Sequence, residues 1–289
     1  MDSVEISNLV LRATALTKTN WLHAVYILEQ ALDEYPDNLR ILLNLGEIYL
    51  ERQIFVKALG YFQKAIAVKP NDPYILTIIG NCYYATGEYR LALSYYNKIT
   101  DVTPEVLYNT ALCLTYLGMN KESITVLDKL IQFLPDNPFI HFMLIEQYMR
   151  IQNYETAFQY LTKAEKRFGN HKQLLLLSAI LHAKRGIWLK AYHCFAEYNT
   201  MNRIVNPEQL IAYSQAAQKI GMDNRAVELL KSALSFNPYI SSTYEELVRL
   251  QLQMNDYKGA RESMKLAKKH LVRISPVLKI LQERIHNEE

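Results

Sequence analysis

The chain has 289 residues, of which half are hydrophobic and 21% are charged. This composition excludes an intrinsically disordered chain, which combines few apolar residues with a high net charge. The net charge is only +3, from 32 basic and 29 acidic residues, and no basic stripe dominates the chain. The sequence therefore argues against nucleic-acid binding, which needs many phosphate contacts.

Targeting and redox features indicate an intracellular protein. The start, MDSVEISN, lacks the basic and apolar regions of a secretory signal, and the most apolar stretch, 174–183, is too short to span a bilayer. The three cysteines cannot all pair, so we interpret them as reduced core residues. We expect a cytoplasmic chain without a membrane span.

A small residue recurs along the chain at intervals of about 34 residues, which is a period typical of a helical repeat. The positions are Ala24, Ala58, Ala92, Ser123, Ala157, Ala191, Ala226 and Ala260. A small side chain at a fixed place allows two helices to approach closely. The period predicts a solenoid made of one repeated unit rather than a single globular core.

The stretch 39–70 shows the unit most clearly. Its apolar residues first follow one helix face, then a break occurs at 51–54, and a second helical pattern runs to Pro70. The unit is therefore predicted to be a helix–turn–helix.

The signature positions of this stretch resemble those of the tetratricopeptide repeat family. They are Leu42, Leu45, Gly46, Tyr49, Ala58, Phe62, Ala65 and Pro70, with Leu42 in place of the usual tryptophan. The next block resembles the family equally well, at Leu76, Ile79, Gly80, Tyr83, Tyr89, Ala92, Tyr96 and Pro104. The resemblance implies an all-α, right-handed superhelical solenoid of about eight helix–turn–helix repeats.

In chain order, the blocks form one tandem array over 1–274, followed by a capping helix at 275–289. The blocks are 5–38, 39–72, 73–103, 104–137, 138–171, 172–206, 207–240 and 241–274. Gly87, Gly118, Gly186, Gly221 and Asn255 fall where a left-handed residue would close the first helix of a block.

Three places depart from the regular pattern. Arg12 replaces the usual small residue, so the first block could serve as a cap. The junction at 101–105 is three residues short, so we expect Thr103 and Pro104 to lead almost directly into the next helix. In the capping helix, Val277, Ile280, Leu281 and Ile285 are predicted to form the apolar stripe.

Catalytic and metal-binding signals are poor. Cys194, His182 and His193 form the only metal-like group, and their spacing matches no familiar zinc site. Phosphate-binding loops and nucleophile motifs are absent from the sequence. We therefore expect no enzyme activity, no metal and no cofactor.

The resemblance implies a partner-binding groove on one face of the first helices. The candidate groove residues are Asn44, Tyr74, Asn81, Tyr84, Tyr108, Asn109, Leu112, Phe139, Phe142, Glu146 and Leu176. Aligned apolar side chains of this kind mark protein-binding surfaces, although a neighbouring repeat can also bury them.

Asn81, Asn109 and Asn44 occupy positions where peptide-binding members of the family hold a ligand backbone, because an amide both donates and accepts hydrogen bonds. Asparagine is also common in the family consensus at these places. The cationic side chains that grip acidic chaperone tails are missing beside Asn81 and Asn109, where Thr77, Phe139 and Met143 stand. We expect no binding of such tails.

The leading hypothesis is a non-enzymatic scaffold or adaptor that binds a protein or peptide segment, most simply an amphipathic one. The alternative is a self-assembling structural protein that forms homo-oligomers through its end faces or capping helix. RNA binding is a weaker alternative because no code-like residue pair repeats along the chain.

Overall fold

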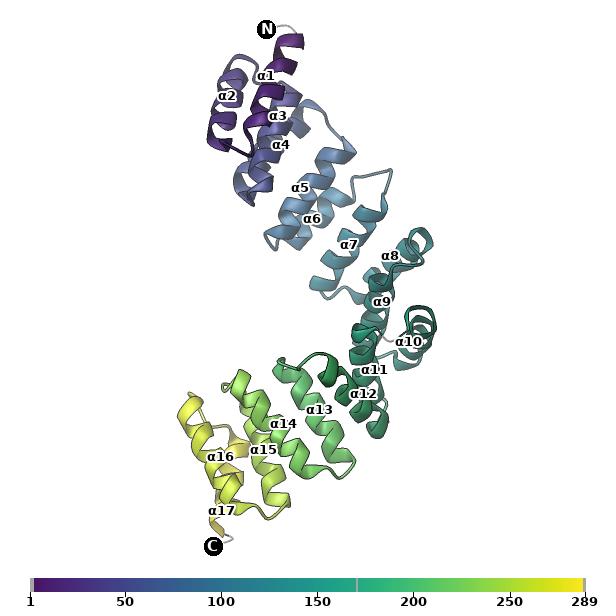
Figure 1. Cartoon of the computed structure of the whole chain (residues 1–289), viewed down its shortest axis with the longest axis vertical. Coiled ribbons are helices and arrows are strands. Elements are labelled where there is room, and N and C mark those ends of the chain that lie inside the picture. The colour runs from purple at the N-terminus through teal and green to yellow at the C-terminus, as the bar shows by residue number, and fades with distance from the viewer. Residues whose placement is uncertain (1–2, 170, 288–289) are drawn as a thin grey trace. The chain divides into compact units, whose positions relative to one another are not determined.

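The computed structural model describes residues 3–169 and 171–287, and within these residues every regular element is an α-helix (Figure 1). The chain divides into two compact units, one ending at Ile140 and the other beginning at His141. The first unit contains α1 (Ser3–Leu16), α2 (Trp21–Glu34), α3 (Leu39–Glu51), α4 (Phe55–Val68), α5 (Pro73–Ala85), α6 (Tyr89–Tyr96), α7 (Pro104–Tyr116) and α8 (Asn120–Phe133).

The division falls inside α9 (Pro138–Arg150). The second unit continues with α10 (Tyr154–Phe168), α11 (Lys172–Lys184), α12 (Trp188–Met201), α13 (Pro207–Lys219), α14 (Asp223–Phe236), α15 (Ser241–Gln253), α16 (Tyr257–His270) and α17 (Pro276–Asn287). The prediction of an all-α fold is confirmed.

Consecutive helices pack in pairs within each unit. In the first unit, α1 packs on α2, α3 on α4, α5 on α6 and α7 on α8, and each of α3, α5 and α7 also packs on the second helix of the preceding pair. One continuous apolar cluster accordingly runs from Val10 to Cys82, through five helices. This arrangement is a repeat solenoid, in which each pair buries its apolar faces against its neighbours.

The recurring small residue lies at the contact between the two helices of a pair. All eight positions are at most 1% exposed. On the first helices, Gly46 lies against Phe62, and a Cβ atom there would stand 2.6 Å from the phenyl ring. A Cβ atom at Gly80 would overlap the ring of Tyr96 more severely. Ser123 contacts the first helix of its pair directly, since its hydroxyl donates to the Ala111 carbonyl at 3.2 Å.

Left-handed residues close the first helix of most pairs, as predicted for four glycines and Asn255. The backbone φ angle is between 59° and 83° at Gly87, Gly118, Gly186, Gly221 and Asn255. Gln53 and Gln152 adopt the same conformation, at 58° and 61°, although side chains rarely do so. Sequence reasoning missed these two because glutamine carries no conformational signal.

The short junction at 101–105 has a different origin from the one expected. Pro104 does begin α7, and Thr103 caps it by accepting a hydrogen bond from the Val106 amide at 3.3 Å. The block is short, however, because the helix before the junction, α6, is shorter than its counterparts. Helix α6 has 8 residues, whereas α4 and α8 have 14 each. The connection at 97–103 is therefore long, and Ile99 anchors it in the core with 5% exposure.

The capping helix uses a different stripe from the predicted one. Leu278, Leu281 and Ile285 are buried against α15 and α16, whereas Ile280 is 59% exposed. The prediction for Ile280 is wrong because it stands two residues from Leu278, on the opposite side of a helix with 3.6 residues per turn. These apolar side chains cover the end of the last helix pair and are therefore buried within the chain.

The close contact at Gly80 predicts a measurable penalty for a single methyl group. We expect Gly80→Ala to lower the free energy of unfolding by about 1–3 kcal/mol, because the Tyr96 ring must move out of its packed place. Urea denaturation followed by circular dichroism measures the change.

Gly60 provides the matched control, since it lies inside α4 with no atom within 4 Å of an added Cβ. Gly60→Ala should instead raise stability by about 0.5–1 kcal/mol through helix propensity. Equal shifts for the two variants would contradict the assigned role of Gly80.

Candidate protein-binding surface

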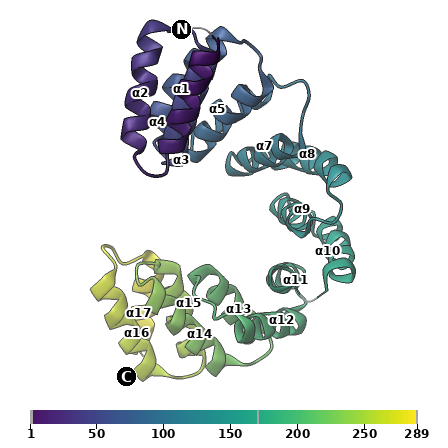
Figure 2. The same cartoon turned by 45° about the horizontal axis from the view of Figure 1, so that its top comes forward.

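Helices α5 and α7 lie side by side in the first unit (Figure 2). Both helices carry aromatic and amide residues. We call this set the α5–α7 face. Its members are Tyr74, Asn81 and Tyr84 from α5, and Tyr108, Asn109, Leu112 and Tyr116 from α7. Successive members are three, four or seven residues apart, except for the adjacent Tyr108 and Asn109, and such spacings place side chains on one side of a helix.

Asn81 is the centre of a hydrogen-bond network on this face. Its Oδ1 atom accepts from the hydroxyl of Tyr96 at 2.7 Å and from Nδ2 of Asn109 at 2.9 Å. Its own Nδ2 donates to a carboxylate oxygen of Glu105 at 3.3 Å. The Asn81 amide therefore joins α5, α6 and α7, and its acceptor atom is fully used within the chain.

This network qualifies the expectation that Asn81 and Asn109 hold a ligand backbone. Sequence reasoning placed both residues on one face, and the structure brings them into direct contact. Because the Asn81 oxygen already has two donors, its main task is to fix the spacing of neighbouring first helices.

Three tyrosines form a compact cluster at the end of the face. The ring of Tyr89 stacks on Tyr116 with centroids 4.7 Å apart, and Tyr84 lies 5.7 Å from Tyr89 and 6.1 Å from Tyr116. Burial, with Tyr116 close by, raises the pKa of Tyr84 to about 12. Its hydroxyl therefore stays protonated at physiological pH, while Tyr116 is 61% exposed and offers its ring to a partner.

Tyr74, Tyr108 and Leu112 complete the accessible part of the face. Tyr74 is 51% exposed, and its hydroxyl donates to the carboxylate of Glu47 on α3. Partial burial and this hydrogen bond raise the pKa of Tyr74 to about 12. Tyr108 and Leu112 are partly buried. The ring of Tyr74 is thus held in place before any partner arrives.

Two other predicted residues of the first unit lie outside this face. Asn44 is tied to its own helix, where its Nδ2 donates to the Arg40 carbonyl at 2.8 Å, and it accepts a long bond of 3.4 Å from Thr14. Phe139 is 56% exposed and lines a separate shallow hollow beside Phe133 and Leu134.

The prediction that Phe142 and Leu176 line an open surface is wrong. Phe142 is 3% exposed in a core cluster with Ile145 and Leu161, and Leu176 is 6% exposed against Ala179 and Tyr213. Helix packing inside the second unit covers both side chains. This is the burial by adjacent repeats that sequence periodicity leaves open.

Glu146 also lies in the second unit, where it is partly buried. Burial raises its pKa, and Arg150 and a hydrogen bond with Gln173 oppose that shift. The carboxylate is consequently committed to neighbouring side chains of the same unit.

Sequence reasoning missed three contributors to the face, namely Tyr89, Glu47 and Glu105. Tyr89 holds a signature position and was interpreted as core, yet its ring is only partly buried and stacks on Tyr116. The two glutamates stand at the ninth and second positions of their blocks, which are face positions, so the helix register could have identified them.

The cysteines show no sign of activation. Burial raises the pKa of Cys82 and of Cys113 to about 11, so both stay protonated thiols. Burial also raises the pKa of Cys194, whose sulfur lies 3.7 Å from the Ser178 hydroxyl. In residues 3–169 and 171–287, no group of three His, Cys, Asp or Glu side chains is placed to hold a metal ion.

Comparisons with known proteins find similar repeat proteins. A tetratricopeptide repeat model matches residues 15–73, and a model described as "Anaphase-promoting complex, cyclosome, subunit 3" matches residues 53–130. A tetratricopeptide repeat protein from Parabacteroides merdae has a similar structure, with a TM-score of 0.63 and 19% identity over 86% of this chain and 99% of that chain. The chain therefore has the tetratricopeptide repeat fold.

Other solved structures share the fold of this repeat protein. One is from the "APC/C hetero-tetramer Cut9-Hcn1", with a TM-score of 0.60 and 13% identity over 96% of this chain, which spans 62% of that chain. Another is PilF of Pseudomonas aeruginosa, with a TM-score of 0.54 and 16% identity over 74% of this chain and 96% of that chain. No curated protein sequence matches the chain.

The described helices are also too short or too polar to cross a membrane. The comparisons show no catalytic activity.

The Asn81 network predicts a specific loss of stability. We expect Asn81→Ala to lower the free energy of unfolding by about 1–3 kcal/mol, because the partly buried Tyr96 hydroxyl and the Asn109 amide lose their shared acceptor. The shift in the urea midpoint measures the effect.

Asn44→Ala is the control, because Asn44 bonds mainly within its own helix. Its expected cost is about 0.5 kcal/mol or less. A loss for Asn44→Ala as large as that for Asn81→Ala would refute the special role of the network.

Proposed function

We propose that this repeat protein is a non-enzymatic scaffold or adaptor that holds a segment of a partner protein on the α5–α7 face. The observation that carries the proposal is the exposure of Tyr74 and Tyr116 on a face where Asn81 and Asn109 are hydrogen-bonded to each other. Tetratricopeptide folds generally mediate protein–protein interaction, which supports a protein as the ligand.

The mechanism rests on preorganisation. Tyr116 is stacked on Tyr89, and Tyr74 is held by Glu47, so little side-chain freedom remains to be lost on binding. Aromatic side chains contribute much of the affinity at such surfaces because they bury large areas with a defined geometry. A partner segment with apolar anchors, either helical or extended, suits this face.

The charge on the face favours one class of segment. Glu47 and Glu105 stand beside the tyrosines and asparagines. An acidic chaperone-type tail would meet these carboxylates and would be repelled. The proposed partner segment is therefore apolar, with neutral or basic flanking residues.

The cellular setting follows from the same proposal. Cys82 and Cys113 are free and buried, and Cys194 is free and partly buried, which suits a reducing compartment. We infer a cytoplasmic protein, and a fractionation experiment in the source cells tests this inference.

Removing the accessible rings should abolish partner capture. We expect the triple variant Tyr74→Ala/Tyr108→Ala/Tyr116→Ala to retain less than about a tenth of the wild-type partner signal, since the main apolar anchors are lost. An affinity pulldown with the intact chain, followed by quantitative mass spectrometry, measures this signal.

A matched control removes exposed apolar side chains from second helices of the same unit. Tyr26, Val56 and Leu91 are 59%, 80% and 44% exposed on α2, α4 and α6. The triple alanine variant of these residues should capture the partner as the wild type does. If the control loses the partner and the α5–α7 variant keeps it, the binding surface lies on the second helices instead.

Self-assembly is the second candidate, and one observation favours it. Leu11, Leu22 and Tyr26 are 67%, 63% and 59% exposed on α1 and α2. A second copy could cover this N-terminal apolar surface. The capping helix does not favour assembly, because its apolar stripe is buried within the chain.

Light scattering at several concentrations tests self-assembly. We expect the wild type to shift towards dimers as concentration rises, and Leu11→Glu/Leu22→Glu to remain monomeric at every concentration. A wild-type chain that stays monomeric at high concentration would exclude this candidate.

A further inference from the structure

Basic residues outnumber acidic ones over 247–287 of the second unit, although Glu245 and Glu246 stand directly before this stretch and Glu288 and Glu289 directly after it. Residues 247–287 contain nine lysines and arginines and only three acidic residues, while the whole chain has a net charge of +3. Several of these basic side chains surround α17. The charge therefore marks a surface distinct from the α5–α7 face, which belongs to the first unit.

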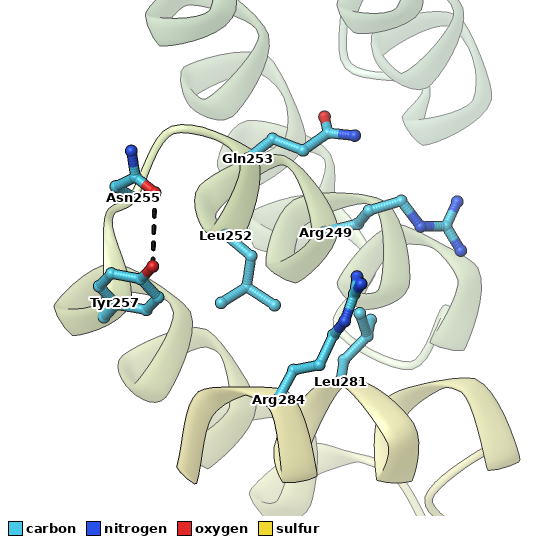
Figure 3. Close-up of a pocket in the computed structure, with 7 residues that line it drawn as sticks. All are labelled: Arg249, Leu252, Gln253, Asn255, Tyr257, Leu281 and Arg284. Atoms are coloured by element: carbon cyan, nitrogen blue, oxygen red, sulfur yellow. Dashed lines mark hydrogen bonds between the residues drawn. The ribbon is translucent and has the colours of Figure 1, made fainter. Parts of the chain in front are cut away.

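A pocket of about 360 Å³ lies within this charged region (Figure 3). Helix α15, the turn that follows it, the start of α16 and the inner side of α17 form its walls. The lining residues are Arg249, Leu252, Gln253, Asn255, Tyr257, Leu281 and Arg284. Figure 3 shows Asn255 and Tyr257 on one side, Leu252 in the middle, and the two guanidinium groups on the other.

The polar groups of the pocket are mainly hydrogen-bond donors. Arg249 and Arg284 have no carboxylate partner among the residues that the structure describes. The side-chain oxygen of Gln253 accepts a bond from Gln218 at 3.3 Å, which leaves its amide nitrogen as a donor. Arg249 and Arg284 line the same pocket, and a carboxylate bound there could accept charge-assisted hydrogen bonds from both guanidinium groups.

The pocket also has an apolar component. Leu281 is 5% exposed at its base, and Leu252 is partly buried beside it. An inorganic anion would use only the arginines, whereas a carboxylate next to an apolar side chain would use both parts of the pocket. This combination occurs in acidic, amphipathic protein segments.

We propose that this pocket binds an acidic segment of a partner protein, with a Glu or Asp carboxylate held by Arg249 and Arg284 and an adjacent apolar side chain placed against Leu252. The planar guanidinium groups give carboxylates two-point hydrogen bonding. A nucleic acid suits the pocket less well, because it needs a basic stripe that follows a phosphate backbone rather than one pair of arginines over leucines.

The basic residues on the other side of α17 have a supporting task. Arg261, Lys265 and Lys268 line a second hollow with Ile285 and His286. Their charges increase the local concentration of acidic segments and speed association without contacting the carboxylate in the pocket. This difference in task allows a matched comparison.

Fluorescence anisotropy with the full-length chain tests the proposal. The probe is a fluorescein-labelled, C-terminally amidated peptide that contains two Glu-Leu dipeptides separated by Gly-Ser spacers. The control peptide has Gln in place of both Glu residues. We expect R249Q/R284Q to weaken binding of the acidic peptide at least tenfold, and the wild type to bind the Gln peptide at least tenfold more weakly than the acidic one.

The variant K265Q/K268Q removes the same charge from the other side of α17, and we expect it to weaken binding less than threefold. Equal losses in the two double variants would overturn the proposal, because they would indicate diffuse attraction alone. Equal affinity for the two peptides, or no binding of the acidic peptide at millimolar concentration, would also overturn it. So would tighter binding of oligouridylate with the same dependence on Arg249 and Arg284, which would indicate a nucleic-acid site.

Two further measurements distinguish loss of the C-terminal pocket from unfolding and from effects of the α5–α7 face. Thermal unfolding of each variant verifies that the exposed substitutions leave the fold intact. The Tyr74→Ala/Tyr108→Ala/Tyr116→Ala variant should bind the acidic peptide as the wild type does. The C-terminal pocket and the α5–α7 face can therefore fail independently.

Discussion

The close approach of the two helices in each pair is the constraint on which the rest of the structure depends. A small residue on the second helix and, in several pairs, a glycine or alanine on the first helix remove the side-chain volume that would separate them. Once a pair is closed, its remaining apolar faces must be covered by the next pair, and the chain propagates as a solenoid. The exposed residues of the first helices are then spaced regularly, and this spacing places Tyr84 of α5 near Tyr116 of α7.

Charge divides the potential binding surfaces of the protein into two chemical classes. The α5–α7 face combines aromatic rings with Glu47 and Glu105, whereas the pocket beside α17 combines leucines with Arg249 and Arg284. A segment suited to one site is disfavoured at the other. A scaffold with two surfaces of opposite charge would distinguish two partners, or two parts of one partner, without any change in its backbone.

Much of the fold could be predicted from the sequence because the same pattern of small and apolar residues recurs in each block. The left-handed glycines and the start of α7 at Pro104 also followed from local chemistry. The burial of Phe142 and Leu176 could not be predicted, because the same face position is open in one pair and covered in another according to how neighbouring helices pack. Gln53 and Gln152 escaped prediction because surrounding structure imposes their conformation. For the α5–α7 face, the periodicity identified which side of each helix carries the candidate residues. The hydrogen bonds of Asn81 could not be predicted in this way, because they depend on side-chain geometry.

The short helix α6 has a consequence for cooperativity along the chain. An eight-residue helix makes few hydrogen bonds of its own and depends on its neighbours for stability. In a linear array, each helix pair contacts only the neighbouring pairs. The least stable pair therefore limits how many pairs unfold together. Tyr96 and Ile99 carry much of that coupling here, through the Asn81 bond and core packing. A ligand that contacts both α5 and α7 would couple these helices directly, without α6. The helices on either side of α6 would then unfold in a single cooperative transition.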